Sequence, residues 1–399
     1  MVLMSIRRAT EDDFDTIAEL ERYAYSLPPE YFEMSRERFP YTWNDYLLLE
    51  ENGVAIASAR VIPLQQNLRG LWKKMGAVAM ITSYPETRRR GHVRRLTTHM
   101  FQVMHDEGYA ASVLYPFKDT FYGAFGYVNC PPRLRVTANP CHLSRWKLPE
   151  GYIVKRMSME DAVDHYKTLF NEIGASTHGA TARSEKRWNE LTTRSRIETA
   201  VAFGPGGKAE GVMLYQHKGY SDFMGEANIG SMNVKEWYWE NHLARSALLN
   251  FVYLHSDQIV KASLPVNPLL DDYYQWVEGR NILELKTGLT YMARCIDVQV
   301  ALEGLPASND GQLTFRVTDP HCEWNNQTYW IDASGGTMKV EPIGDADTDA
   351  TLKIEGISAL LYGTLSVHDL EPYDWISGPV PKLLSNLFPK KYIWMYEDF

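Results

Sequence analysis

The residues best suited to chemistry form the run RRRGHVR at positions 88–94. An apolar stretch, Ala77–Ser83, precedes them and is long enough for a buried strand, which Tyr84-Pro85 then ends. Beyond the run, apolar residues recur at helical spacing until Gly108, namely Leu96, Met100, Val103 and Met104. The spacing predicts a strand, a basic glycine-bearing loop, a helix and then a second strand at Ala110–Tyr115.

Such a loop suits the binding of a phosphate. The first turn of a helix has backbone N–H groups without internal partners, and the helix dipole adds partial positive charge there. Gly91 has no Cβ, so an anion can approach the main chain, and the arginines at 88, 89, 90 and 94 add charge-assisted hydrogen bonds. A basic run can also be a solvated surface, but its place between a buried strand and an amphipathic helix favours phosphate binding.

A tyrosine-rich segment, FYGAFGY at 121–127, follows the second strand. A phenol with its reference pKa of about 10 stays protonated at neutral pH, so Tyr122 could supply a proton, and Tyr127 is its competitor. Histidines that could accept a proton are also near in sequence: His92 lies in the loop, while His99 and His105 lie on the helix. The residues alone leave these alternatives open.

Several elements must position these groups. Ser5–Arg8 is predicted to be a strand, and Thr10 to cap a helix whose first turn is acidic. Tyr46–Glu50 and Val54–Val61 flank an Asn-Gly step, which predicts a hairpin. A further strand is expected at Arg133–Ala138, and the prolines near it favour a domain boundary at about residue 148.

The next part resembles a worn copy of the first. It contains a cap pattern at 158–161 like that at 10–13, a glycine-rich hairpin at 204–207, and a strand at Met232–Trp237 that leads into a helix. Where the first copy has RRRGHV, this one has WYWENH, with neither glycine nor arginine, and Glu240 would repel a phosphate. We therefore expect an internal repeat that kept the fold and lost the phosphate site.

From Tyr291 onward the pattern changes to alternating strands joined by Gly, Asn and Asp turns. We expect strands at Cys295–Leu302, Gly311–Val317, Gln327–Ala333, Gly336–Val340 and Ala350–Glu355, with short helices at Ile357–Leu365 and Lys382–Leu387. The chain then ends in an aromatic tail at 391–399 that reads as docked rather than solvated.

Composition narrows the class of protein. The 399 residues are 45% hydrophobic and 23% charged, as in a globular protein of two or three domains. A formal charge of -9 disfavours nucleic acid as a partner and would attract cationic amines. We expect no membrane span and no signal peptide, and four scattered cysteines indicate a reduced cytoplasmic protein without a zinc site.

The loop and the tyrosine segment resemble those of a known superfamily. Arg88-x-x-Gly91-x-Val93 is similar to the R-x-x-G-x-[GA] pyrophosphate loop of the GNAT acetyltransferases, which bind coenzyme A, although Val93 departs from the small residue. The segment at 121–127 is similar to F-Y-x-x-x-G-[FY], where that superfamily often has its acid tyrosine. Over its whole length the sequence resembles the Eis (enhanced intracellular survival) family of N-acetyltransferases.

This resemblance implies a fold and an assembly. The fold would be α/β, with α+β parts: a GNAT domain at 1–148 that holds acetyl-CoA, a degenerate GNAT-like domain at 149–289, and a sterol-carrier-protein-like domain at 290–399. The last domain would complete the active site with its C-terminus. Members of the family are typically hexameric, so the resemblance also implies a homohexamer.

It also implies the site residues. Tyr122 would be the acid, and the carboxylate of the C-terminal Phe399 would be the base. Acetyl-CoA would be the co-substrate, without a metal, and its binding residues would be Ile81, Thr82, Ser83, Arg89, Arg90, Gly91, His92, Val93, Arg94, Phe117 and Lys118, although the last two differ from the types expected at their positions.

The leading expectation is therefore an acetyl-CoA-dependent N-acetyltransferase acting on amines of a cationic acceptor such as an aminoglycoside, a polyamine or lysine. Two alternatives come from other readings of the same pattern. One is a lipid or sterol carrier with a vestigial catalytic domain, and the other is an N-acyltransferase for longer acyl chains.

Overall fold

The computed structural model describes residues 3–192, 197–219, 230–268, 271–278, 283–288, 290–348, 350–395, 397 and 399. The chain divides into two compact units. The first unit comprises Met1–Cys130, Tyr291–Ile393 and Glu397–Phe399, and the second comprises Pro131–Thr290 with Trp394–Tyr396. Within the described residues, no helix is both long enough and apolar enough to cross a membrane.

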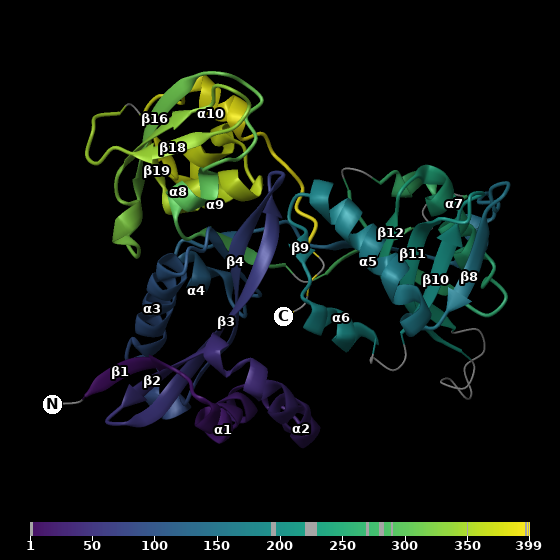
Figure 1. Cartoon of the computed structure of the whole chain (residues 1–399), viewed down its shortest axis with the longest axis horizontal. Helices are drawn as coiled ribbons and strands as arrows, with labels where there is room; N and C mark the ends of the chain where they lie inside the picture. Colours follow the sequence, from purple (N-terminus) through teal and green to yellow (C-terminus); the bar gives the residue numbers. More distant parts are fainter. Residues whose placement is uncertain are drawn as a thin grey trace. The chain divides into compact units, whose positions relative to one another are not determined.

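The first unit is built on a mixed sheet with the strand order β1-β2-β3-β4-β5-β15-β6 (Figure 1). Strands β4 and β5 are parallel, whereas β1 to β4 form antiparallel neighbours. The strand bounds are β1 Met4–Arg8, β2 Tyr46–Glu51, β3 Val54–Leu68, β4 Leu71–Ser83, β5 Ala111–Leu114, β6 Val128–Asn129 and β15 Met292–Cys295. The helices are α1 Phe14–Tyr25, α2 Pro29–Arg38, α3 His92–Asp106 and α4 Asp119–Gly123.

Local sequence sets the two hairpins of this sheet. The predicted Asn-Gly turn joins β2 to β3, with Asn52 at φ 52° and Gly53 at φ 79°, the left-handed pair that a tight hairpin needs. The second turn, between β3 and β4, has Arg69 at φ 56° and Gly70 at φ 102°. Both strands of this second hairpin extend beyond the predicted ranges, so its turn projects away from the sheet towards the C-terminal domain (Figure 1).

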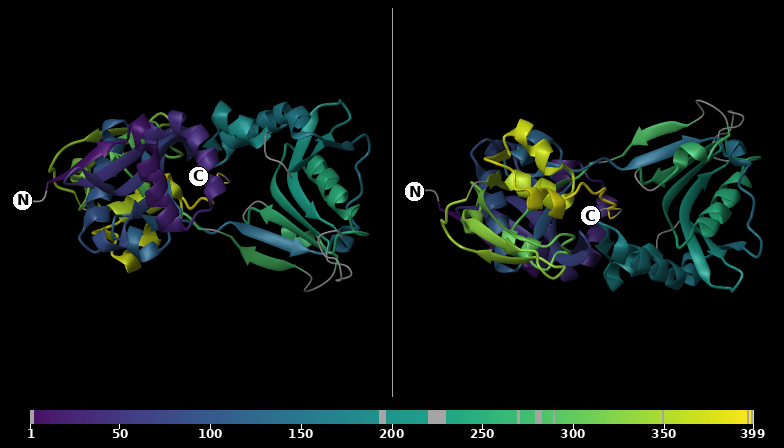
Figure 2. Two further views of the ribbon diagram at one scale, coloured as in Figure 1. Left: turned by 90° about the horizontal axis from the view of Figure 1, so that it is seen from below. Right: turned by 90° about the horizontal axis from the view of Figure 1, so that it is seen from above.

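The C-terminal domain belongs to the same unit, and in both views of Figure 2 its green and yellow ribbon lies against the purple and blue first domain. Its sheet has the order β18-β17-β16-β19-β20. The bounds are β16 Gln312–Thr318, β17 Thr328–Asp332, β18 Lys339–Pro342, β19 Thr351–Lys353, β20 Ile376–Ser377, α8 Val298–Leu302, α9 Ile354–Tyr362 and α10 Lys382–Leu387.

One predicted strand of this domain is wrong. Residues 295–302 do not continue as a strand, because the chain leaves β15 and turns into α8. Asp297 causes the change: its side chain accepts a hydrogen bond from the Val300 N–H and so caps the helix. The strand that does form, β15, lies between β5 and β6 of the first sheet rather than in the C-terminal sheet.

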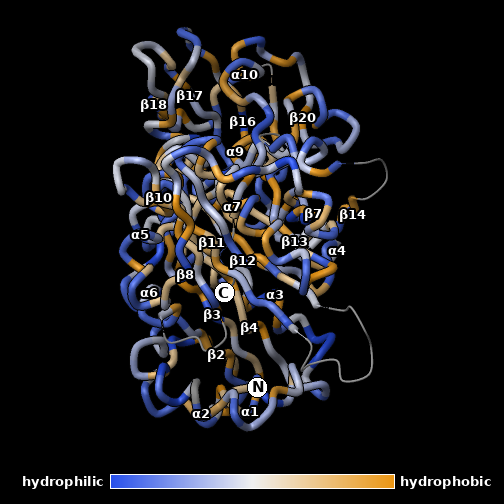
Figure 3. Tube along the Cα trace, turned by 90° about the vertical axis from the view of Figure 1, so that its right-hand side faces the viewer, coloured by the Kyte–Doolittle hydropathy of each residue, from blue (hydrophilic) through white to orange (hydrophobic). Residues whose placement is uncertain are grey.

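The second unit repeats the topology of the first. Its sheet has the order β14-β7-β13-β12-β11-β10-β8, and β12 pairs with β13 in parallel, as β4 does with β5. Figure 3 colours the chain by hydropathy, and both β8 and β11 of this unit contain hydrophobic and hydrophilic stretches. The bounds are β7 Leu134–Ala138, β8 Ile153–Met157, β9 Thr181–Ala182, β10 Glu198–Phe203, β11 Ala209–Lys218, β12 Ser231–Trp239, β13 Lys261–Val266, β14 Glu284–Thr287, α5 Met159–Ser176, α6 Glu185–Thr192 and α7 His242–Tyr253.

The division between the units differs from the boundary expected at about residue 148. The compact units part after Cys130, because β7 does not join the first sheet. Instead β7 pairs with β13 and β14 of the second unit. The first unit instead contains β15, which follows the second unit in the sequence and pairs with β5. The two main segments of the first unit are therefore separated in the sequence by residues 131–290 of the second unit.

The projecting hairpin of the first sheet is anchored in the C-terminal domain by Arg69, which is 5% exposed. Its guanidinium donates to the carbonyls of Leu360, Leu361 and Pro389, at 3.0, 3.1 and 3.0 Å, and lies 5.1 Å from the centre of the Phe388 ring. The first two acceptors belong to the C-terminal end of α9, where partial negative charge favours a cation. Burial lowers the pKa of Arg69 to about 10.

We expect Arg69→Ala to reduce the free energy of unfolding by about 2–3 kcal/mol, because hydrogen bonds to a charged donor contribute about 1.5–3 kcal/mol and several carbonyls lose theirs. Urea denaturation followed by tryptophan fluorescence measures the change. Arg22→Ala, which removes an exposed ion pair with Glu19, is the control and should leave the midpoint unchanged. Equal stability of the two variants would contradict the anchoring role.

Candidate active site

A cavity opens where β4 and β5 separate. The parallel pairing runs from Met75 and Ala111 to Val78 and Leu114, after which β5 ends and β4 continues alone on that side to Ser83. The cavity measures about 1000 Å³ and lies within the first unit. It is lined by Ala24, Tyr25, Val78, Ala79, Met80, Ile81, Thr82, Ser83, Thr87, Arg88, Arg89, Gly91, His92, Val93, Arg94, Tyr115, Phe117, Lys118, Thr120, Phe121, Tyr122, Ala124 and Phe125.

A β-bulge interrupts the regular pairing of β4 with β3 near the cavity. Arg60 pairs with Ala79 and Ser58 with Thr82, so two residues of β4 face one residue of β3. One of the two is Met80, which has a left-handed φ of 50°. The carbonyl of Ile81 points to the open side, where it accepts a hydrogen bond from the Tyr25 hydroxyl at 3.0 Å. Strand β4 therefore presents main-chain groups to the cavity.

The basic loop closes one end of this cavity. Arg89 and Gly91 both have left-handed backbones, at φ 62° and 82°, and α3 begins directly after them at His92. A Cβ built on Gly91 would meet no atom within 4 Å, so the main chain there is open to a ligand. The Nε2 of His92 is buried and has no hydrogen-bond partner among the described residues. These features fit a phosphate group.

The position of α3 depends on close contact with the sheet. The side chains on the inner face of α3 are fully buried, namely those of Leu96, Met100, Phe101 and Met104. At Gly76 on β4 a Cβ would lie 2.5 Å from the Met104 sulphur, so any side chain there would have to displace the Met104 side chain. Helix α3 thus carries the loop against the strand that lines the cavity.

Tyr122 and Tyr127 have different surroundings. Tyr122, on α4, is 4% exposed and lines the cavity, and burial raises the pKa of its hydroxyl well above the usual value. Tyr127 is not among the lining residues, and its hydroxyl lies 2.7 Å from that of Ser112, which itself donates to the Gly76 carbonyl. Burial raises the pKa of Tyr127 to about 12. Of these two tyrosines, Tyr122 is the one placed to meet a ligand in the cavity.

The aromatic tail reaches the same region. Tyr115, the residue after β5, lines the cavity and donates a hydrogen bond to the Glu397 carbonyl at 2.9 Å. Its ring centre lies 5.1 Å from that of Phe399, which is half-buried. The tail is therefore anchored at a wall of the cavity, as its composition predicted.

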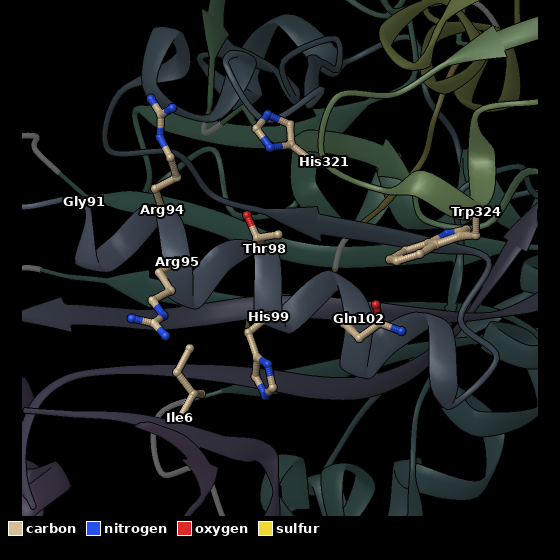
Figure 4. A pocket seen from close by; sticks show the side chains of 9 residues that line it. All are labelled: Ile6, Gly91, Arg94, Arg95, Thr98, His99, Gln102, His321 and Trp324. Carbon is tan, nitrogen blue, oxygen red and sulfur yellow. The ribbon is translucent and has the colours of Figure 1, made fainter. Parts of the chain in front are cut away.

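The three histidines near the loop do not share one site. His92 lines the cavity, whereas His99 lines a separate hollow of about 650 Å³ on the outer face of α3 (Figure 4). Burial, and then the charge of Arg8, lowers the pKa of His99. His105 stacks on Trp324 at 4.2 Å, and its Nδ1 lies 2.9 Å from an Asp297 oxygen. Only His92 could serve a reaction in the cavity.

Most of the predicted site residues come together. Those that line the cavity are Ile81, Thr82, Ser83, Arg89, Gly91, His92, Val93, Arg94, Phe117, Lys118 and Tyr122, while Arg90 and Phe399 are not among the lining residues. Sequence reasoning missed Tyr25, Met80 and Tyr115 as lining residues. Tyr115 had a signal, since it directly follows a buried strand at the end where the loop lies. The bulge at Met80 had no such signal in the sequence, because a bulge depends on how β4 pairs with β3.

The corresponding place in the second unit has no loop. Strand β12 ends at Trp239 and α7 begins at His242, so only two residues join them. Asn241 caps the helix, accepting from the Ala244 N–H at 2.9 Å, and Glu240 pairs with Lys208 at 2.7 Å. A phosphate would meet an occupied helix end and a carboxylate there.

Three segments match known domain families. Residues 5–129 match an acetyltransferase (GNAT) domain family, residues 179–278 match a second acetyltransferase (GNAT) domain family, and residues 298–396 match a sterol carrier protein domain family. No curated protein sequence matches the chain.

Solved structures share the fold over the whole chain. A GCN5-related N-acetyltransferase from Anabaena variabilis is 16% identical, with 100% of both chains covered and a TM-score of 0.87. A conserved protein from Enterococcus faecalis, described as a probable N-acyltransferase, is 21% identical, with the same coverage and TM-score. Eis1 from Mycobacterium abscessus is 17% identical, with 99% of this chain and 100% of that chain covered and a TM-score of 0.78.

The expected order of domains is confirmed, and at the level of the fold so is the resemblance to Eis. GNAT domains use acetyl-CoA as co-substrate, and a basic, glycine-bearing loop beside an open strand edge has the features that fit its phosphates. The chain thus contains two acetyltransferase (GNAT) domains followed by a C-terminal sterol carrier protein domain.

Proposed function

We propose that the first GNAT domain transfers the acetyl group of acetyl-CoA to an amine of a cationic acceptor in the cavity between β4 and β5. The observation that carries this proposal is the meeting, in one cavity, of the open edge of β4, the Gly91 loop and the Tyr122 hydroxyl. These are the features needed to hold an extended thioester with a pyrophosphate at one end and its reacting carbon at the other.

The cofactor contacts follow from the geometry of the loop and the strand. Gly91 and the first turn of α3 would receive the pyrophosphate, with Arg89, Arg94 and the unpartnered His92 Nε2 beside it. The pantetheine arm would run along β4 at Ile81–Ser83, replacing the Tyr25 hydroxyl that occupies the Ile81 carbonyl. Arg90, Phe117 and Lys118 would contact the outer part of the cofactor.

The reaction needs two proton transfers. The acceptor amine loses a proton, its nitrogen forms a bond to the thioester carbon, and the carbon–sulphur bond then breaks. Tyr122 gives its proton to the leaving thiolate, and the raised pKa keeps that hydroxyl protonated at neutral pH. Positioned acids and bases contribute about 10²–10⁴-fold each to the rate.

The carboxylate of Phe399 is our candidate for the base. Contacts of Tyr115 with Glu397 and with the Phe399 ring anchor that end of the tail beside the cavity. A carboxylate accepts the amine proton directly or through a water molecule. His92 is the competing base, since it lines the cavity and has a buried ring nitrogen.

The acceptor would be a polyamine, a lysine side chain or an aminoglycoside, since a net charge of -9 attracts cations. A thiol-release screen across these three classes, with acetyl-CoA and with longer acyl-CoAs, tests the proposal. Turnover with longer chains alone would support an N-acyltransferase of another type, and absence of all turnover would support a carrier role. The hexameric assembly and cytoplasmic location expected from the sequence stay predictions.

Coenzyme A is expected to bind in the first GNAT domain only. Gly91→Val should weaken its binding at least about tenfold, because a β-branched residue at φ 82° is strained and its side chain fills the open cradle. Calorimetry of coenzyme A binding measures the loss. Glu240→Gln, at the equivalent place in the second unit, is the matched control and should bind normally. Two coenzyme A sites per chain would refute the prediction.

Tyr122→Phe should lower kcat by about 10²-fold or more while the affinity for coenzyme A stays unchanged, because only the proton of the acid is lost. Steady-state kinetics together with calorimetry separate the two quantities. Tyr127→Phe removes a hydroxyl that bonds within the core, so it should change kcat little. The opposite ranking of the two variants would show that the acid is misassigned.

A short extension after Phe399 should abolish acetyl transfer and leave coenzyme A binding intact, because it converts the carboxylate into a neutral amide. The extended and unextended proteins are assayed side by side at saturating acetyl-CoA. Phe399→Leu is the matched control, since it keeps both the carboxylate and an apolar side chain, and it should be mild. Full activity of the extended protein combined with an inactive His92→Gln variant would identify His92 as the base.

A further inference from the structure

A buried ion pair lies next to the tyrosine segment that follows α4. Arg294 on β15 and Asp319 in the C-terminal domain are both fully buried, and a guanidinium nitrogen lies 2.6 Å from a carboxylate oxygen. A second guanidinium nitrogen donates to the carbonyl of Phe125, three residues after Tyr122. The guanidinium also lies 4.3 Å from the centre of the Phe101 ring of α3. Arg294 thus joins the tyrosine segment, α3 and the C-terminal domain.

The partner carboxylate is itself held firmly. Asp319 Oδ1 accepts from the N–H groups of His321 and Cys322, at 3.0 and 3.2 Å, and Oδ2 accepts from the Asn325 side chain at 3.0 Å. Asn325 also donates to the Ile296 carbonyl at 2.9 Å, next to β15. Both oxygens of the carboxylate are therefore fixed, and the position of Arg294 is fixed with them.

A second side chain of the same loop contacts the tyrosine segment. His321 Nε2 lies 2.8 Å from the carbonyl of Ala124, and because a carbonyl can only accept, this nitrogen is the donor. The His321 ring also packs against Phe125 at 5.1 Å. Figure 4 shows His321 above α3, near Thr98. Two successive carbonyls that follow α4 are therefore held, that of Ala124 by His321 and that of Phe125 by Arg294, which is itself paired with Asp319 of the C-terminal domain.

The glycine of the tyrosine segment shows how closely Arg294 approaches. Gly126 has φ 81°, and a Cβ built there would lie 2.3 Å from Arg294 Nη1 and 2.7 Å from Ile354 Cγ2. Any side chain at this position would displace the guanidinium. Two physical factors therefore favour glycine at position 126, the glycine of the F-Y-x-x-x-G pattern. One is its left-handed backbone conformation, and the other is that Arg294 occupies the space a side chain would need.

We infer that the C-terminal domain positions the Tyr122 hydroxyl for catalysis, acting through Arg294 and His321, which hold the carbonyls of Phe125 and Ala124. Helix α4 is one short turn of Asp119–Gly123, and the Phe125 and Tyr127 N–H groups both bond to the Tyr122 carbonyl. A shift of the two held carbonyls therefore moves Tyr122 with them. Arg294, His321 and Asp319 are positioning residues, because none of them lines the cavity.

This inference rests on the proposed role of Tyr122 as the acid, and kinetics can separate the two. Arg294→Lys keeps the charge opposite Asp319, but a single ammonium lacks the fork that reaches both Asp319 and Phe125. We expect kcat to fall by about 10²-fold, the effect of a displacement of about 1 Å, with the KM for acetyl-CoA unchanged. His321→Ala leaves no buried charge without a partner. It should lower kcat in the same way as Arg294→Lys, but by a smaller factor.

The decisive measurement is a double-mutant cycle with Tyr122→Phe. If Arg294 and His321 act through Tyr122, neither Arg294→Lys nor His321→Ala lowers kcat further in the Tyr122→Phe background. Arg183→Lys, which alters a buried arginine paired with Glu236 at 2.9 Å in the second unit, is the matched control and should leave kcat unchanged.

The outcomes distinguish the two proposals. Full kcat of Tyr122→Phe would overturn the assignment of the acid. A slow Tyr122→Phe enzyme combined with unchanged kcat in folded Arg294→Lys and His321→Ala proteins, or with effects that multiply in the double variants, would overturn the positioning role alone. If Arg294→Lys does not fold, the His321→Ala cycle decides the question.

Discussion

Burial of the Arg294–Asp319 pair is the constraint on which the first unit depends. Removing two charges from water is costly, and the cost is offset only when both groups have well-placed partners. Here the further partners of the pair come from the tyrosine segment and from the C-terminal loop. Burial opposes the charge of Arg294, but Asp319 raises the pKa of the guanidinium above its usual value, so the guanidinium stays charged. The two domains can therefore separate only by exposing or breaking this pair.

The two GNAT domains show how one sheet topology is used in different ways. In the first unit, the bulge at Met80 and the long connection from Ser83 to His92 leave room beside β4. In the second, a two-residue connection and the Asn241 cap close the equivalent place. Its interior is further occupied by Arg183, which pairs with Glu236 and lies 4.2 Å from the centre of the Phe170 ring. Shared topology thus fixes the position of a site without preserving its chemistry.

Local signals made much of this structure predictable. The loop at 88–94, the Asn-Gly hairpin and the helix after Gly91 were all visible, because glycine, proline and apolar spacing act over a few residues. The sequence did not predict that β7 pairs in the second sheet and β15 in the first. The sequence of a strand does not reveal which other strand it will pair with. The same limit hid Arg294: an arginine within an apolar strand has no visible partner until the fold brings Asp319 to it. Alternation also misled at 298–302, where Asp297 begins a helix.

The exchange of β15 has a consequence for synthesis on the ribosome. The first sheet needs Met292–Cys295, which emerge only after the entire second unit has been translated. Until then the edge of β5 has no neighbour on that side, and Phe125 has no guanidinium to bond. Truncation after residue 130 would leave that edge strand exposed and prone to aggregation. The sheet of the first GNAT domain can therefore be completed only after residues 292–295 have been made, although the sequence of that domain comes first.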